Sequence, residues 1–166
     1  NVSDASSEGG SSIAITTDTL DVTDGTIAAS SSSLGGTTFS GTLAITSGTM
    51  TLTNATLTAN STGSADFTTN GAMSITSNDM VLKNSSLIAS GPMSISSGHF
   101  AFSDTSNEAQ MSAAGISLFA NTVELDHANL ASSTGGDAID ITAGTLKNMS
   151  SVLSTPNGRW LIHLGS

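Results

Sequence analysis

Few residues in this chain have side chains that could do acid–base or metal chemistry. The three histidines, His99, His127 and His163, are far apart in the sequence. They form neither a His-x-His pair nor a His-Glu-x-x-His motif, which are local spacings that zinc sites use. Cysteine is absent, which excludes thiolate ligands and disulfide bonds. The sequence therefore predicts no metal site, and nothing in it calls for a cofactor.

The acidic residues offer no clear catalytic arrangement either. Asp18, Asp21 and Asp24 lie close together and could bridge a calcium ion, but the Gly-Gly-x-Gly-x-Asp calcium repeat is missing. Three solvated turn residues are the simpler explanation for this group. Neither a Gly-x-Ser-x-Gly motif nor a phosphate-binding loop is present. We expect a protein that is not an enzyme.

The overall charge limits the range of partners. The 166 residues include 13 Asp and Glu against 3 Lys and Arg, which gives a net charge of −10. An acidic chain of this kind is a poor partner for nucleic acid or for an anionic membrane. Charged residues make up only 10% of the chain, and this fraction is low for a disordered segment. No apolar run approaches the roughly 20 residues of a membrane-spanning helix.

The elements that carry these side chains are best seen in the stretch 41–59, GTLAITSGTMTLTNATLTA. It contains three short apolar alternations, Leu43/Ile45, Met50/Leu52 and Leu57/Ala59, whose starts are seven residues apart. Alternation with period 2 is typical of a strand with one buried face. Turn-forming residues separate the alternations. Three strands and two corners would form one coil, which must stack on similar coils to bury its apolar edge.

Related alternations recur along the chain, with coils predicted to begin at residues 13, 43, 73, 93, 116 and 139. For the coil from residue 93, the third strand is predicted at Asn107/Ala109. The second inward position of the six coils is a branched apolar residue throughout: Ile15, Ile45, Ile75, Ile95, Leu118 and Ile141. This alignment predicts an all-β fold, a right-handed parallel β-helix, or solenoid, of about six three-strand coils.

The two predicted corners of each coil have different residue types. The first corner contains Asp18, Gly48, Asn78, Gly98, Asn121 and Gly144, a set that suggests positive φ. The second corner contains Asp24, Asn54, Asn84, Asp104, His127 and Ser150. Most of these side chains could hydrogen-bond to their own or the adjacent coil's backbone.

The pattern divides the chain into residues 1–12, a lead-in or the edge of a preceding coil, 13–155, the β-helix, and 156–166, a terminal turn and strand. The first two coils are longer than the third by ten residues, inserted around residues 30–40 and 60–70. Each insertion contains one phenylalanine, Phe39 or Phe67. Both insertions follow the same position of the repeat. We therefore expect the stacked coils to bring Phe39 and Phe67 close to Leu34 and Asp66. The phenylalanines either pack over the helix edge or form a protruding lobe that binds a partner.

The last segment of the chain contains a short motif that, together with the coils, resembles a known family. Ser- and Thr-rich coils of about 20 residues followed by Gly158-Arg159-Trp160-Leu161-Ile162 resemble the repeat rod of filamentous-haemagglutinin-like exoproteins. Gram-negative bacteria secrete these adhesins by two-partner secretion. The resemblance implies a right-handed parallel β-helix, export through an outer-membrane transporter, and cell adhesion, biofilm formation or virulence. The Asn-Pro-Asn motifs of the family's secretion domain are missing, which suggests a piece from the later rod.

We therefore expect a segment of a secreted or cell-surface adhesin. Its partners would be a host surface glycan, a matrix protein or a biofilm polysaccharide, and the segment is either a binder or a spacer. An ice-binding solenoid is the first alternative, although no outward column is expected to be a run of threonine. A polysaccharide-acting β-helix enzyme is less favoured, because the outward column of the second strand, Asp21, Thr51, Val81, Ala101, Glu124 and Lys147, gathers no catalytic set.

Overall fold

The computed structural model describes residues 2–5, 11–32, 41–62, 71–106 and 108–165. These residues form fourteen strands and no helix. The strands belong to two seven-stranded sheets, and all the neighbouring strands pair in parallel. The predicted all-β class and parallel β-helix are confirmed.

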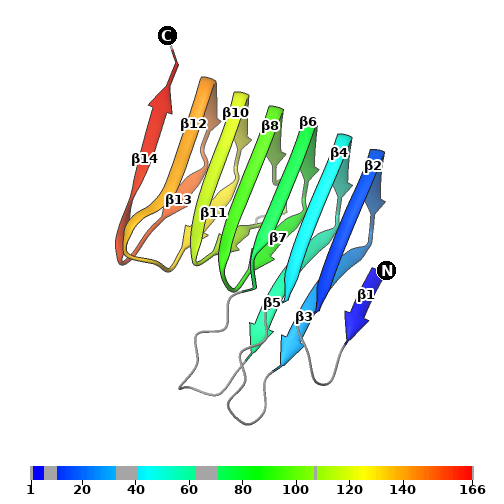
Figure 1. Cartoon of the computed structure of the whole chain (residues 1–166). Helices are drawn as coiled ribbons and strands as arrows, with labels where there is room; N and C mark the ends of the chain where they lie inside the picture. The colour runs from blue at the N-terminus through cyan, green and yellow to red at the C-terminus, as the bar shows by residue number, and fades with distance from the viewer. Residues whose placement is uncertain (1, 6–10, 33–40, 63–70, 107, 166) are drawn as a thin grey trace.

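The two sheets lie against each other along the whole stack (Figure 1). We call the first the long-strand sheet; it contains β2 (Ser12–Thr23), β4 (Thr42–Thr53), β6 (Met73–Lys83), β8 (Pro92–Ser103), β10 (Gly115–Asp126), β12 (Gly136–Met149) and β14 (Gly158–Leu164). The second, the short-strand sheet, contains β1 (Val2–Ala5), β3 (Thr26–Ser32), β5 (Thr56–Thr62), β7 (Ser86–Ala89), β9 (Met111–Ala113), β11 (Asn129–Ser132) and β13 (Val152–Ser154).

One long strand and the short strand that follows it form one coil, and the described residues hold six such coils. The pairing register joins Ile13, Leu43, Met73, Met93, Ile116 and Ile139 in one column, which confirms the six predicted coil starts. Side chains of this column and of the one beginning at Ile15 point into the core. From the second coil onward they are almost fully buried, as Ile75 is at 1% exposure. The stack thus has one continuous apolar core.

The first corner differs from the prediction. The first two predicted strands of each coil are one continuous long strand, whose pairing skips a single residue, as at Asp18 opposite Gly48. We call the part before this bend the first wall, the part after it the second wall, and the short-strand sheet the third wall.

The expectation of positive φ at the first corner is wrong, because none of its residues has a left-handed backbone. Gly48 is needed for another reason: a Cβ there would lie 2.7 Å from the backbone oxygen of Asp18 in the preceding coil. Buried hydroxyls satisfy the carbonyl groups at the bend. Ser77 Oγ donates to the oxygen of Asp79 at 2.8 Å, and Ser97 does the same one coil further on.

Positive φ occurs instead at the second corner, at five of its six predicted residues; Asp104 is the exception. Asp24, Asn54, Asn84, His127 and Ser150 all have φ between 48° and 59°. At this corner each coil also bonds to the next through the backbone. The N–H of Asn54, for example, donates to the oxygen of Lys83 at 3.0 Å. Asparagine and aspartate adopt this conformation more readily than most residues, which explains why they recur here.

The coil beginning at Met93 departs from the prediction in its third strand. The register places Met111 beside Leu87 and Leu130, so β9 is the third strand and the predicted Asn107/Ala109 pair is wrong. Met111 follows Met93 by eighteen residues, whereas Leu87 follows Met73 by fourteen. The additional residues lie in a loop at the second corner, the loop 104–110, of which the structure describes 104–106 and 108–110. In the next coil the additional residues stand elsewhere, between Ser132 and Ile139.

Each sheet has a free edge at each end of the stack, where the two termini also lie (Figure 1). Strand β1, from the predicted lead-in, pairs with β3 and occupies the third wall one coil before it. Strand β14 pairs with the first half of β12, with Trp160 beside Ile139. The first and last coils are therefore each flanked by only part of a further coil.

Candidate functional site

The two insertions begin side by side on the third wall. Strands β3 and β5 pair as far as Ser32 beside Thr62, and the buried hydroxyls of Ser31 and Ser61 are 2.7 Å apart. The predicted binding residues Leu34, Phe39, Asp66 and Phe67 lie outside the described residues. That these four residues lie together and bind a partner stays a prediction. The register of the strands that lead into the insertions favours it.

A second irregular feature, the loop 104–110, was missed by the sequence analysis. Its anchor is Asp104, which is 2% exposed. One carboxylate oxygen accepts hydrogen bonds from the backbone N–H and hydroxyl of Ser106 at 2.8 and 2.7 Å. The other oxygen accepts from the backbone N–H of Ala109 at 3.0 Å. A carboxylate that accepts several backbone N–H groups holds a loop firmly, because each of these bonds is charge-assisted.

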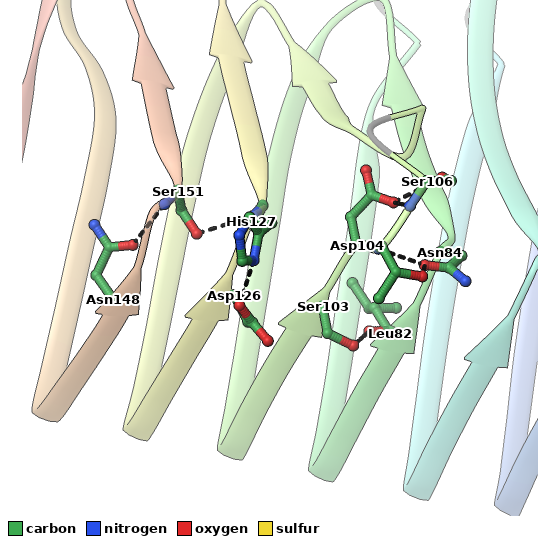
Figure 2. A network of polar contacts seen from close by, with 11 residues as sticks. Leu82, Asn84, Ser103, Asp104, Ser106, Asp126, His127, Asn148 and Ser151 are labelled. Atoms are coloured by element: carbon green, nitrogen blue, oxygen red, sulfur yellow. Dashed lines mark hydrogen bonds and ion pairs between the residues drawn. The ribbon is translucent and has the colours of Figure 1, made fainter.

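Neighbouring coils add further polar contacts along the same corner (Figure 2). Asn84 Oδ1 accepts from the backbone N–H of Thr105 at 2.8 Å, which ties the loop to the preceding coil. Further along, Ser151 Oγ accepts from the N–H of Ala128 at 2.9 Å. Figure 2 shows these groups in a row that follows the stack. The corner is therefore a polar seam, which we define as the second-corner residues together with the loop 104–110.

A groove of about 360 Å³ lies along this polar seam. It is lined by amide, hydroxyl and carboxylate groups from three successive coils: Asn54, Thr56, Asn84, Ser86, Ser106 and Glu108. Its size is near the lower limit of small-molecule sites. Such groups can exchange hydrogen bonds with the hydroxyls of a sugar ring, and the groove is therefore a second place where a glycan could bind. The sequence contains one signal for this groove. Asp104 stands at the second corner and is followed by more residues before the third strand than the preceding coil has.

The first wall carries a column of hydroxyl side chains that the sequence analysis also missed. The expectation that no outward column is a run of threonine is wrong, because the register aligns Thr16, Thr46 and Thr76, with Ser96 next. All four are exposed. Phe119, which is 56% exposed, interrupts the hydroxyl groups, and the column then continues with Thr142. Neighbouring strands in a sheet are about 4.8 Å apart, so these hydroxyls form a regular row. This row could have been found in the sequence, because each hydroxyl residue directly follows the second inward position of its coil.

Beside this row lies a parallel column of small residues, which keeps the surface flat. Its members are Ala14, Ala44, Ser74, Ser94 and Ser117, all of them exposed. We call the two columns together the hydroxyl face. A hollow of about 310 Å³ lies at the end of this face, beside Ser94 and Ser117. The part of the face before it could lie against an extended ordered surface.

The ionisable groups of the second wall form pairs between coils. Lys147 Nζ donates to Glu124 Oε1 at 2.6 Å, and this hydrogen bond, together with the charge of the lysine, lowers the pKa of Glu124. His99 Nδ1 lies 2.7 Å from Asp79 Oδ1 in the same way. These pairs are all partly exposed to solvent, so their contribution to stability is small.

Catalytic or metal-binding groups do not assemble in the parts of the chain that the structure describes. No set of three His, Asp or Glu side chains there could hold a metal ion. His127 lies against its sequence neighbour Asp126, and His163 points outward 3.6 Å from Asp140. Nor do the described residues include a helix that could cross a membrane.

Comparisons with protein-family models, with curated proteins and with solved structures found no match to this chain.

Proposed function

We propose that this chain is a segment of the rigid rod of a secreted or cell-surface adhesin of a Gram-negative bacterium. The observation that supports this most strongly is the unbroken register of six coils in both sheets. At about 4.8 Å per coil, the six coils extend roughly 30 Å along one axis. Their walls hold that length without a hinge, which suits a protein that must keep a binding site away from the cell.

The resemblance of Gly158–Ile162 and of the Ser- and Thr-rich coils to filamentous-haemagglutinin-like exoproteins supports the same proposal. It adds export through an outer-membrane transporter and a role in adhesion or biofilm formation. The proposed partners are a host surface glycan, a matrix protein or a biofilm polysaccharide. We propose that direct contact is made by the two insertions, because they follow neighbouring strands, β3 and β5, at the same place in the repeat.

The test is adhesion of the chain displayed on beads, measured against glycan and matrix-protein arrays and against biofilm polysaccharide. A shortened variant replaces residues 30–42 and 60–72 with Ser90-Gly91-Pro92, the connection between Ala89 and Met93 in the third coil. We expect it to keep its β circular dichroism and to lose binding. A second variant, Phe39→Ser with Phe67→Ser, keeps the loop lengths and tests the aromatic groups alone.

Two results would contradict parts of this proposal. Full adhesion by the shortened variant would move the binding site away from the insertions. The groove beside Glu108 would then be tested next, with Glu108→Ala and Thr56→Ala. If the intact chain binds no surface, glycan or matrix protein, it is a spacer without its own binding site.

The hydroxyl face favours a second candidate function, the binding of ice. Thr16, Thr46 and Thr76 present their hydroxyls in a flat, regular row, as a solenoid that binds an ordered water lattice would require. Inhibition of ice recrystallisation by the wild type and by Thr145→Lys, but not by Thr46→Lys, would support this function. Thr145 is a matched control because it is exposed on the second wall. Growth of ice unaffected by the wild type would reject ice binding and leave the adhesin proposal standing.

A further inference from the structure

The amide side chains of the second corner form a ladder that is interrupted inside the stack. Between the first and second coils the ladder is closed, because Asn54 Nδ2 donates to Asp24 Oδ1 at 3.1 Å. Between the second and third coils the backbones are also joined, since the N–H of Asn54 donates to the oxygen of Lys83 at 3.0 Å. The side chains of Asn54 and Asn84, however, form no hydrogen bond with each other. Both line the groove of about 360 Å³ on the polar seam.

The loop 104–110 explains this interruption. Asn84 Oδ1 accepts from the backbone N–H and the hydroxyl of Thr105 at 2.8 and 3.1 Å, and Figure 2 shows Asn84 beside Asp104 of the same loop. The amide nitrogen of Asn84 donates to none of the described residues. On the other side of the interruption, Asn54 Oδ1 accepts from none of them. A free amide donor and a free amide acceptor, from neighbouring coils, therefore line one groove.

These two groups are complementary to a single amide group of a ligand. Asn54 Oδ1 can accept a hydrogen bond from an N–H, and Asn84 Nδ2 can donate one to a carbonyl oxygen. The acetamido group of an N-acetylated amino sugar presents an N–H and a carbonyl oxygen together. Such a group would close the ladder between the two coils, whereas a simple hydroxyl would satisfy the two asparagines less well.

The rest of the lining fits the other parts of such a sugar. The hydroxyls of Thr56 and Ser86 can exchange hydrogen bonds with the hydroxyls of the ring. Ala55 and Ala109, which are nearly buried, offer apolar surface to a methyl group. Glu108 is exposed, and it is the charged member of the lining. Its carboxylate would repel a sugar that carries an acidic group.

We propose that this groove binds an N-acetylated amino sugar without an acidic group, as one unit of a glycan. The role of this site rests on the proposed adhesin function, for which it names the class of glycan. The groove lies on the second to fourth coils, so complete coils flank it on both sides. It is small and open, and we expect a Kd on the order of 1 mM or weaker. A contact this weak is not expected to support adhesion without the insertions.

The test is a titration followed by nuclear magnetic resonance, with methyl glycosides as probes. Those of N-acetylglucosamine and N-acetylgalactosamine are compared with those of glucose and galactose, which have a hydroxyl in place of the acetamido group. The readout is the side-chain NH₂ signal of Asn84, assigned by its absence from Asn84→Asp.

We expect an acetamido sugar to shift the Asn84 signal and to bind at least about tenfold more tightly than its hydroxyl counterpart, because it makes two additional hydrogen bonds. Equal binding of the two members of each pair would overturn the proposal. So would an Asn84 signal that neither acetamido sugar shifts.

A matched pair of variants locates the site. Asn84→Asp keeps an acceptor for Thr105 and a residue type that tolerates positive φ, but it removes the amide donor. We expect it to lose the preference for the acetamido sugar. Asn78→Asp makes the same change at the exposed first corner of the same coil and should bind like the wild type. An unchanged preference in Asn84→Asp, or an equal loss in Asn78→Asp, would contradict a site in the groove.

The methyl glycoside of N-acetylneuraminic acid tests the effect of charge, because it carries an acetamido group together with a carboxylate. We expect it to bind the wild type more weakly than the better of the two neutral acetamido sugars. This difference should decrease in Glu108→Gln, which removes the charge and keeps the size of the side chain. Binding of the acidic sugar as tight as that of the neutral one would contradict the expected exclusion of acidic groups.

The sugar titration and the adhesion test fail in different ways. If the displayed chain adheres but no acetamido sugar shifts the Asn84 signal, the groove is not the proposed site and the adhesin function stands. If the sugars bind in the groove but the displayed chain adheres to nothing, the site stands and the adhesin function is wrong. The shortened variant should keep the response of Asn84, because the residues that line the groove lie outside both insertions.

Discussion

Substitution of Gly48 separates two physical reasons for a glycine at the first corner. If glycine were there for a positive φ, asparagine would be accepted and alanine would not. The structure gives the other reason, the close approach of Asp18 in the preceding coil. Any side chain with a Cβ should then destabilise the fold, whatever its preference for positive φ. We expect Gly48→Ala, Gly48→Asn and Gly48→Val all to lower the free energy of unfolding.

The size of the effect follows from the contact. A Cβ on Gly48 would lie 2.7 Å from a backbone oxygen, whereas ordinary van der Waals contact begins at 3.4 Å. The two coils must therefore separate locally by more than half an ångström. Overpacking of this kind costs about 1–3 kcal/mol. Replacing a strand glycine by alanine otherwise gains roughly 0.5–1 kcal/mol. The net loss should be about 1–2 kcal/mol for Gly48→Ala and larger for Gly48→Val.

The matched comparison is Asn54 at the second corner, where φ is 49°. Asn54→Gly should be nearly neutral, and Asn54→Ala should cost roughly 1–2 kcal/mol because of its left-handed backbone. Urea unfolding followed by far-UV circular dichroism measures both series, with the slope m held constant as a check on the unfolded state. A stable Gly48→Asn beside an unstable Gly48→Ala would refute the close-approach argument and restore a positive φ.

Three further substitutions test the core, the loop and the second wall. Ile75→Asp places an unpaired charge between buried isoleucines and should cost several kcal/mol, seen as a large loss of Tm; an unchanged Tm would mean that this column is not internal. Asp104→Asn presents an N–H group to the backbone donors of the loop and should cost about 1–3 kcal/mol; unchanged protease resistance at 104–110 would argue against the anchor. Glu124→Gln should lower Tm slightly at neutral pH. The pair with Lys147 lowers the pKa of Glu124, so its stabilisation is present above the ordinary pKa of a glutamate and is lost as the pH falls through the lowered value. The Tm difference between wild type and Glu124→Gln should therefore vanish in acid, and a difference that persists there would have another cause.

The sequence predicted the coil starts because the inward columns obey a strict alternation that only a stacked register satisfies. The sequence predicted the wrong element where two local patterns fit equally well. Asn107/Ala109 and Met111/Ala113 both alternate, and only the carboxylate of Asp104, which holds Ala109 in the loop, decides between them. Similarly, a glycine required by a neighbouring coil, such as Gly48, has the same sequence signature as one required by a turn.

The candidate sites were predictable to different degrees. The insertions were visible from coil length alone, and the strands that lead into them are in the predicted register. The hydroxyl row at Thr16, Thr46 and Thr76 could have been found from the sequence by aligning the outward residues of the first predicted strand of each coil. The sequence analysis aligned those of the second strand instead. The groove beside Asn84 and Glu108 could not be derived, because it depends on how the loop 104–110 folds back against a corner two coils away.

The connections between equivalent strands differ in length, and this has a consequence for engineering and for evolution. Ala89 reaches Met93 in four residues, whereas Ser132 reaches Ile139 in seven, and both connections deliver the chain to the same place in the next coil. Each strand is positioned by hydrogen bonds to its neighbour, so the length of the preceding connection is free to change. A peptide grafted between Ser133 and Gly136 should therefore be displayed beside the stack without shifting β12. The fold can acquire a new recognition loop in one step, by insertion at a corner, without any compensating change in its core.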